Sequence, residues 1–162
     1  IMQEKPVIIH GDGTTWWTLT HNTDFAKGFI GLMGNAHAIG ETFQITSDEV
    51  LTWNQIYEEI AKRLGVTLKP YHVSSEFLAA VSDYDFTGSL IGDKANSVVL
   101  DCSKLKRAVP NYCATTRFDQ GVRRTIANVL ATPSLQRLDP EFDAWCDKVV
   151  EAMEMAKKMV IG

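Results

Sequence analysis

The spacing of apolar side chains changes period several times along the chain, which predicts short strands mixed with helices. A β-branched run at residues 7–9 is ended by Gly11-Asp12-Gly13 and is typical of a buried strand that enters a turn. Four short strands are predicted in all, at residues 7–9, 43–45, 71–73 and 98–100.

The predicted helices follow from apolar residues at helical spacing. The best defined begins after Thr52, where Gln55 completes a capping box, and it ends at Gly65. Other helices are predicted at residues 24–35, from Ser74 or Ser75 to Val81, from Asp101 or Ser103 to Pro110, at residues 118–130 and from Asp139 onward. Residues 82–97 are polar and predict a long loop with at most a helical turn.

The order of these elements predicts a mixed α/β fold with few short strands, several helices and part of a parallel sheet, in a single domain over residues 1–162. So few parallel strands make a poor sheet alone, because such sheets need neighbours and covered faces. Ile1 is not an initiator methionine, and the chain starts one step before a strand. We therefore expect a fragment of a longer chain, whose bare strand edge favours homo-oligomers.

Composition narrows the function classes. Hydrophobic residues make up 45% and charged residues 22% of the chain, which is ordinary for a globular protein. The net charge of -4 argues against nucleic acid as a partner, and no apolar run approaches the ~20 residues that span a bilayer. The three cysteines form no Cys-x-x-Cys pair, so we expect free thiols in a cytoplasmic protein, with Cys102 buried.

Three glycines have the spacing of a cofactor-binding loop but lie in a different structural context. Gly28, Gly31 and Gly34 have the spacing of the loops in short-chain dehydrogenases. Such a loop must leave a strand and open a helix, so that backbone N–H groups meet the pyrophosphate. Here the glycines fall inside a helical pattern, which predicts close packing of that helix against a neighbour.

The catalytic groups of the short-chain superfamily are absent as well. Its pair is a tyrosine followed four positions later by a lysine, which lowers the phenol pKa. The tyrosines at 57, 71, 84 and 112 are followed at that offset by Ala61, Ser75, Gly88 and Thr116. Tyr57 comes closest to this pattern, because Lys62 follows it by five positions instead of four. The four histidines form no ligand pair, so no metal is predicted.

An ordered set of segments nevertheless resembles the extended short-chain NAD(P)-dependent epimerase/dehydratases. Residues 7–24 resemble a strand, a Gly-Asp-Gly turn and a stretch ending in the Asp that opens a helix, and the later matches are residues 38–47, 50–65, 101–107 and 117–130. The resemblance implies the C-terminal, substrate-binding part of a Rossmann-type epimerase fold. The missing N-terminal Rossmann domain would then be a partner that carries the Tyr/Lys pair and binds NAD or NADP.

The resemblance also implies a substrate site, with two departures. Nucleotide-sugar members usually carry arginines where this chain has Trp17 and Leu90, which cannot make bidentate contacts to a diphosphate. The expected ligand is therefore a polar small molecule other than a nucleotide-diphosphate sugar. The residues that the resemblance places in the substrate site are His10, Asp12, Trp17, Leu19, Asp93 and Lys94.

Two functions remain open at the level of sequence. In the first, the parent is an NAD(P)-dependent epimerase, dehydratase or reductase, and this chain has no catalytic residue and is inactive alone. In the second, the chain is a non-catalytic ligand-sensing or scaffold module derived from the same fold. The absence of the Tyr/Lys pair from this chain is consistent with both of these functions.

Overall fold

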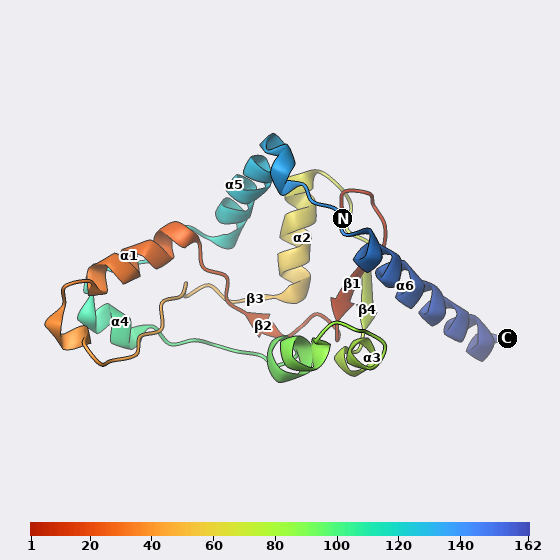
Figure 1. The fold of residues 1–162 in the computed structure, drawn as a ribbon, viewed down its shortest axis with the longest axis horizontal. Helices are drawn as coiled ribbons and strands as arrows, with labels where there is room; N and C mark the ends of the chain where they lie inside the picture. The colour runs from red at the N-terminus through yellow and green to blue at the C-terminus, as the bar shows by residue number, and fades with distance from the viewer.

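Two small sheets lie at the centre of the computed structural model, which describes residues 1–162 (Figure 1). β1 (Val7–His10) pairs in parallel with β4 (Pro70–Val73), so that His10 lies opposite Val73. β2 (Trp16–Trp17) pairs antiparallel with β3 (Leu51–Thr52). The parallel pair and the surrounding helices confirm the predicted α/β class.

The predicted helices are all present. α2 (Trp53–Leu64) begins as expected: the Thr52 side chain accepts from the Gln55 N–H, the Gln55 side chain accepts from the Thr52 N–H, and Gly65 closes the helix with φ 72°. The other helices are α1 (Asn22–Leu32), α3 (Ser75–Ala80), α4 (Ser103–Ala108), α5 (Phe118–Ala131) and α6 (Pro140–Ile161), with 3-10 turns η1 (Ala36–Ala38) and η3 (Pro133–Leu135).

Two predicted strands are wrong. Residues 43–45 and 98–100 are irregular, because no neighbouring strand in this chain completes a ladder with them. Residues 82–97 contain more helix than expected, since η2 (Thr87–Lys94) is a π-helical segment. β2 and β3 were missed because two-residue strands leave no periodic signal.

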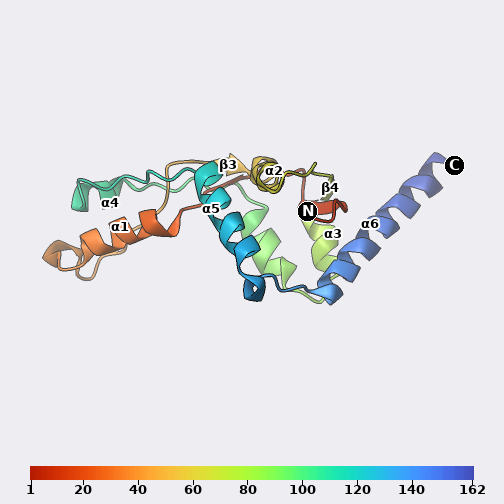
Figure 2. The same cartoon turned by 90° about the horizontal axis from the view of Figure 1, so that it is seen from above.

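The chain is elongated (Figures 1 and 2). α1 and α4 lie together at one end, and α3 and α6 lie at the other. The accessible surface is 10565 Å², whereas a folded monomer of this mass exposes about 8,000 Å². Along α1 and its C-cap Met33, the apolar stripe that the sequence predicts is largely exposed, at 47% for Phe25, 53% for Phe29 and 67% for Met33. A large apolar area is therefore left uncovered.

The buried core is correspondingly small. One cluster joins β4, α3, η2 and α6 through Val73, Leu78, Leu90 and Val149. No helix combines the length and the apolar content that crossing a membrane would need.

The glycine motif is explained by packing. A Cβ on Gly28 would lie 2.7 Å from the Ile45 side chain, and one on Gly31 would collide with Val109 just beyond α4. Gly34 ends the helix with φ 77°. The predicted close packing is confirmed for Gly28 and Gly31, whereas Gly34 forms a turn.

Candidate substrate site

The candidate site forms where β1 ends, which is the edge at which open α/β sheets bind ligands. His10 is the last residue of β1, and its Nε2 donates to the Lys94 carbonyl oxygen at 3.1 Å. The hydroxyl of Thr15 donates to the same oxygen at 3.0 Å. These two bonds fix the end of η2 against the turn that follows β1.

Aromatic rings connect the turn to α2. His10 meets Trp53 edge-on with 5.0 Å between ring centroids, and Trp17 lies 5.7 Å from the same indole. The Lys94 ammonium sits 5.6 Å from the centre of the Trp17 ring and 2.9 Å from the Asp93 carboxylate. Four of the predicted residues are thus neighbours, although more than 80 positions separate His10 from Lys94.

The other two predicted residues lie apart from this cluster. Asp12 is exposed, and its carboxylate accepts from the hydroxyl and the N–H of Thr14, which hold its pKa below the ordinary value. Its carbonyl oxygen accepts from the Asn54 side chain at 3.0 Å. Leu19 is half-buried beyond β2 and takes no part in the bonds and ring contacts that join the cluster.

The cluster carries little free positive charge. Burial lowers the pKa of His10, and the Lys94 carbonyl offsets this only partly, so the ring is neutral near pH 7. The Lys94 ammonium is shared between Asp93 and the Ser89 carbonyl. Leu90 is 8% exposed and packs in the core cluster, and it also lines the cavity to which His10 contributes. Of Trp17 and Leu90, the two residues that stand where arginines were expected, only Trp17 lies in the cluster.

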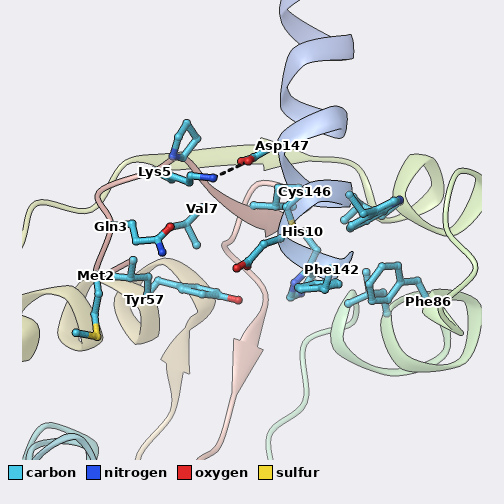
Figure 3. A pocket seen from close by; sticks show the side chains of 17 residues that line it. Met2, Gln3, Lys5, Val7, His10, Tyr57, Phe86, Phe142, Cys146 and Asp147 are labelled. Carbon is cyan, nitrogen blue, oxygen red and sulfur yellow. Dashed lines mark hydrogen bonds and ion pairs between the residues drawn. The ribbon is translucent and has the colours of Figure 1, made fainter. Parts of the chain in front are cut away.

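A cavity of about 500 Å³ adjoins the cluster and shares His10 with it (Figure 3). Its walls come from the first residues of the chain, β1, α2, η2 and the first turns of α6. Sequence reasoning missed this cavity, because Phe142 and Trp145 have the spacing of an ordinary helix stripe. Tyr57 likewise falls at the spacing of the apolar face of α2, which gives no signal of a cavity.

Neither the glycine motif nor Lys62 is placed to bind a dinucleotide or to activate a tyrosine. The space beside Gly28 and Gly31 is filled by the side chains of Ile45 and Val109, which leaves no loop for a pyrophosphate. Lys62 pairs with Glu59 at 3.3 Å on the exposed side of α2. No group of three or more histidine, cysteine or acidic side chains could hold a metal ion.

Comparison with known proteins shows that this fold is similar to part of a Rossmann-like epimerase fold. No protein-family model matches the chain. The 2'-dehydrokanamycin reductase of Streptomyces kanamyceticus is 29% identical over 66% of this chain and 30% of its own length. A protein of Bacillus subtilis strain 168, the uncharacterized UDP-glucose epimerase YtcB, is 28% identical over 78% of this chain and 35% of its own length. The chain thus spans about a third of these curated relatives.

Solved structures agree on the fold. Epimerase Mth375 of Methanothermobacter thermautotrophicus matches 83% of this chain and 35% of its own, with a TM-score of 0.66 and 19% identity. The NAD complex of dTDP-glucose 4,6-dehydratase from Bacillus anthracis matches 82% of this chain and 37% of its own, with a TM-score of 0.61 and 18% identity. Relatives and structural neighbours are thus members of the NAD-dependent epimerase/dehydratase family, which confirms the resemblance seen in the sequence.

Proposed function

We propose that this chain is the substrate-binding portion of an NAD(P)-dependent epimerase, dehydratase or reductase acting on a polar small molecule. The observation that carries the proposal is the cluster of His10, Trp17, Asp93 and Lys94 at the carboxyl end of β1. The cluster can contact a ligand, but it contains no activated tyrosine. Catalytic groups and cofactor therefore come from elsewhere in the parent protein, and the isolated chain is inactive.

The charge of the cluster argues against a nucleotide-diphosphate substrate. A diphosphate needs cations that can bond to its oxygens, but the single ammonium here is already shared with Asp93. Arg63, on α2, is held by Asp119 at 3.3 Å and belongs to another part of the fold. The names of the two relatives point to different substrates, so the proposal depends on the charges of this site.

The uncovered face of α1 supports a cofactor-binding partner domain. A groove of about 710 Å³ beside α1 is lined mainly by apolar residues of α1 and of residues 34–45, together with the polar Asn35, Glu41 and Gln44. Residues 43–45 have the strand-like alternation of an element that lacks its neighbour. A Rossmann-type domain placed here would supply that neighbour and would bury the exposed rings of Phe25 and Phe29.

Two measurements test the proposal. Incubating the 162-residue chain with NAD(H) or NADP(H) and candidate carbonyl or alcohol substrates should give no turnover, and clear turnover would contradict the proposal. The intact mass of the protein in its native host should be well above 18.0 kDa and in the range of its relatives. A native mass near 18.0 kDa would favour the ligand-sensing or scaffold module instead.

A further inference from the structure

The cavity beside the candidate site has the size of a small-molecule pocket. Its volume of about 500 Å³ falls within the ~300–1,000 Å³ range of such pockets. The first residues of the chain and β1 form one side of it, and the first turns of α6 form another (Figure 3). His10 lines both the cavity and the candidate site, so one ligand can reach both.

The inner surface of the cavity is apolar and aromatic. Leu78 and Leu90 are 3% and 8% exposed, so they form a buried part of the lining. The rings of Phe142 and Trp145 stack with 5.7 Å between centroids. The Trp145 indole N–H donates to the Val81 carbonyl oxygen at 3.1 Å, which fixes the orientation of the ring. This surface is ready to pack against a ring of a ligand.

The charged groups of the lining balance one another and are not buried. In the 162-residue chain they are the α-ammonium of Ile1, Lys5, Asp143 and Asp147, two positive and two negative. Lys5 and Asp147 pair at 2.6 Å with side chains 51% and 45% exposed, and Asp143 is exposed as well (Figure 3). A charged ligand inside the cavity would therefore find no buried counter-charge.

The titratable groups of the interior are held in their neutral forms. Burial is the largest cause in each case, because it raises the pKa of the Tyr57 phenol and of the Cys146 thiol and lowers the pKa of the His10 imidazole. The loss of water that disfavours these charged forms disfavours a charged ligand in the same space. The interior therefore favours a neutral ligand.

Tyr57 supplies a free polar group. Figure 3 shows its hydroxyl directed into the open space from α2, and no hydrogen bond within the protein holds it. A phenol hydroxyl can both donate and accept a hydrogen bond. A ligand that fills the cavity must offer it a partner, because a buried hydroxyl without one costs free energy.

We propose that this cavity binds a neutral, ring-bearing part of the substrate. The ring packs against Phe142 and Trp145, and one hydroxyl or carbonyl group of the ligand bonds to the Tyr57 hydroxyl. The rest of the substrate passes His10 and reaches the polar contacts of Lys94. The inference rests on the proposed function, since it names the chemical class of one part of that substrate.

Three phenyl compounds test the inference on the 162-residue chain at pH 7: the neutral benzyl alcohol and the charged benzylamine and benzoate. Binding is followed by NMR through the Trp145 indole N–H. The alcohol should bind at least about tenfold more tightly than either charged probe, because burying an unpaired charge costs more than burying a bonded hydroxyl. A charged probe that binds as tightly as the alcohol, or alcohol binding that leaves the Trp145 signal unmoved, would overturn the proposal.

Matched variants test the role of Tyr57. Tyr57→Phe should weaken the binding of benzyl alcohol severalfold and leave that of toluene, which has no hydroxyl, unchanged. Tyr84→Phe removes a phenol hydroxyl from a ring outside the lining, 5.2 Å from the Phe142 ring, and should leave both affinities unchanged. Full affinity of Tyr57→Phe for benzyl alcohol would overturn the proposed bond to Tyr57.

The inference and the proposed function fail separately. A preference for a charged probe would overturn the neutral site and leave the proposed function in place. Turnover by the isolated chain, or a native mass of 18.0 kDa, would overturn the proposed function and leave the selectivity of the cavity unchanged.

Discussion

The buried carboxylate of Asp24 accepts a 2.8 Å hydrogen bond from the backbone N–H of Thr116, 92 positions further along the chain. The Lys27 ammonium lies 2.6 Å from its other oxygen. This contact holds the first turn of α1 against the segment that leads into α5. Burial alone would raise the pKa of Asp24, but the hydrogen bonds from Lys27, Thr116 and Thr115 outweigh it and lower the pKa to about 2.

The Asp24 contact predicts acid sensitivity. The folded-state pKa of about 2 lies below the ordinary 3.8, so the stabilisation is complete above pH 3.8 and is lost as the pH falls toward 2. A shift of this size corresponds to roughly 2 kcal/mol. Urea unfolding across this range should show the loss in the unmodified chain and little of it in Asp24→Asn. Asp83→Asn, at an exposed position, should keep the loss; a flat profile in the unmodified chain would contradict the prediction.

The capping box of α2 predicts a local loss of stability. Thr52→Ala removes the oxygen that accepts from the Gln55 N–H and should lower the free energy of unfolding by about 1 kcal/mol. Thermal or urea unfolding checks this value. The control is Thr67→Ala at an exposed position beyond the helix, which should change the free energy little. Equal effects of the two substitutions would argue against the cap.

The packing at Gly28 reverses the usual effect of alanine. In a helix interior Gly→Ala stabilises by about 1 kcal/mol, but here the added Cβ would lie 2.7 Å from Ile45 and 3.1 Å from Tyr112. Gly28→Ala should therefore destabilise the chain in urea unfolding. Adding Ile45→Ala should make the Gly28→Ala step less unfavourable than it is alone, and additive effects in this double-mutant cycle would refute the contact.

Replacing Trp17 by arginine should give the chain a stronger affinity for phosphate groups. Trp17→Arg places a bidentate donor beside Lys94 and should increase the affinity for UDP at least severalfold in isothermal titration. Trp16→Arg adds the same charge at an exposed neighbour and should have a much smaller effect. Tight UDP binding by the unmodified chain would contradict the proposed exclusion of nucleotide diphosphates.

The exposed face of α1 predicts self-association of the isolated chain. Phe25 and Phe29 stack at 6.1 Å and are about half exposed, so a second copy can cover them. Sedimentation should show oligomers at high concentration, and Phe29→Glu should shift them toward monomer. Glu76→Gln, at an exposed position on α3, serves as the control. A strictly monomeric unmodified chain would refute this prediction.

The sequence by itself determined the features whose partners lie within a few residues. Thr52, Gln55 and Gly65 define the ends of α2, because caps and capping boxes bond across three or four positions. Asp139 and Pro140 likewise start α6. The glycines at 28 and 31 were correctly separated from a cofactor loop, since that loop needs a strand before it and the sequence shows a helix.

Only the tertiary structure decided which distant groups meet. It joined His10 to the Lys94 carbonyl, placed Leu90 in the core, and formed the cavity from elements at both ends of the chain. It also left residues 43–45 without a ladder, although their alternation is that of a strand. Strand pairing and cavities depend on contacts between segments far apart, and the periodicity of one segment carries no information about its partner.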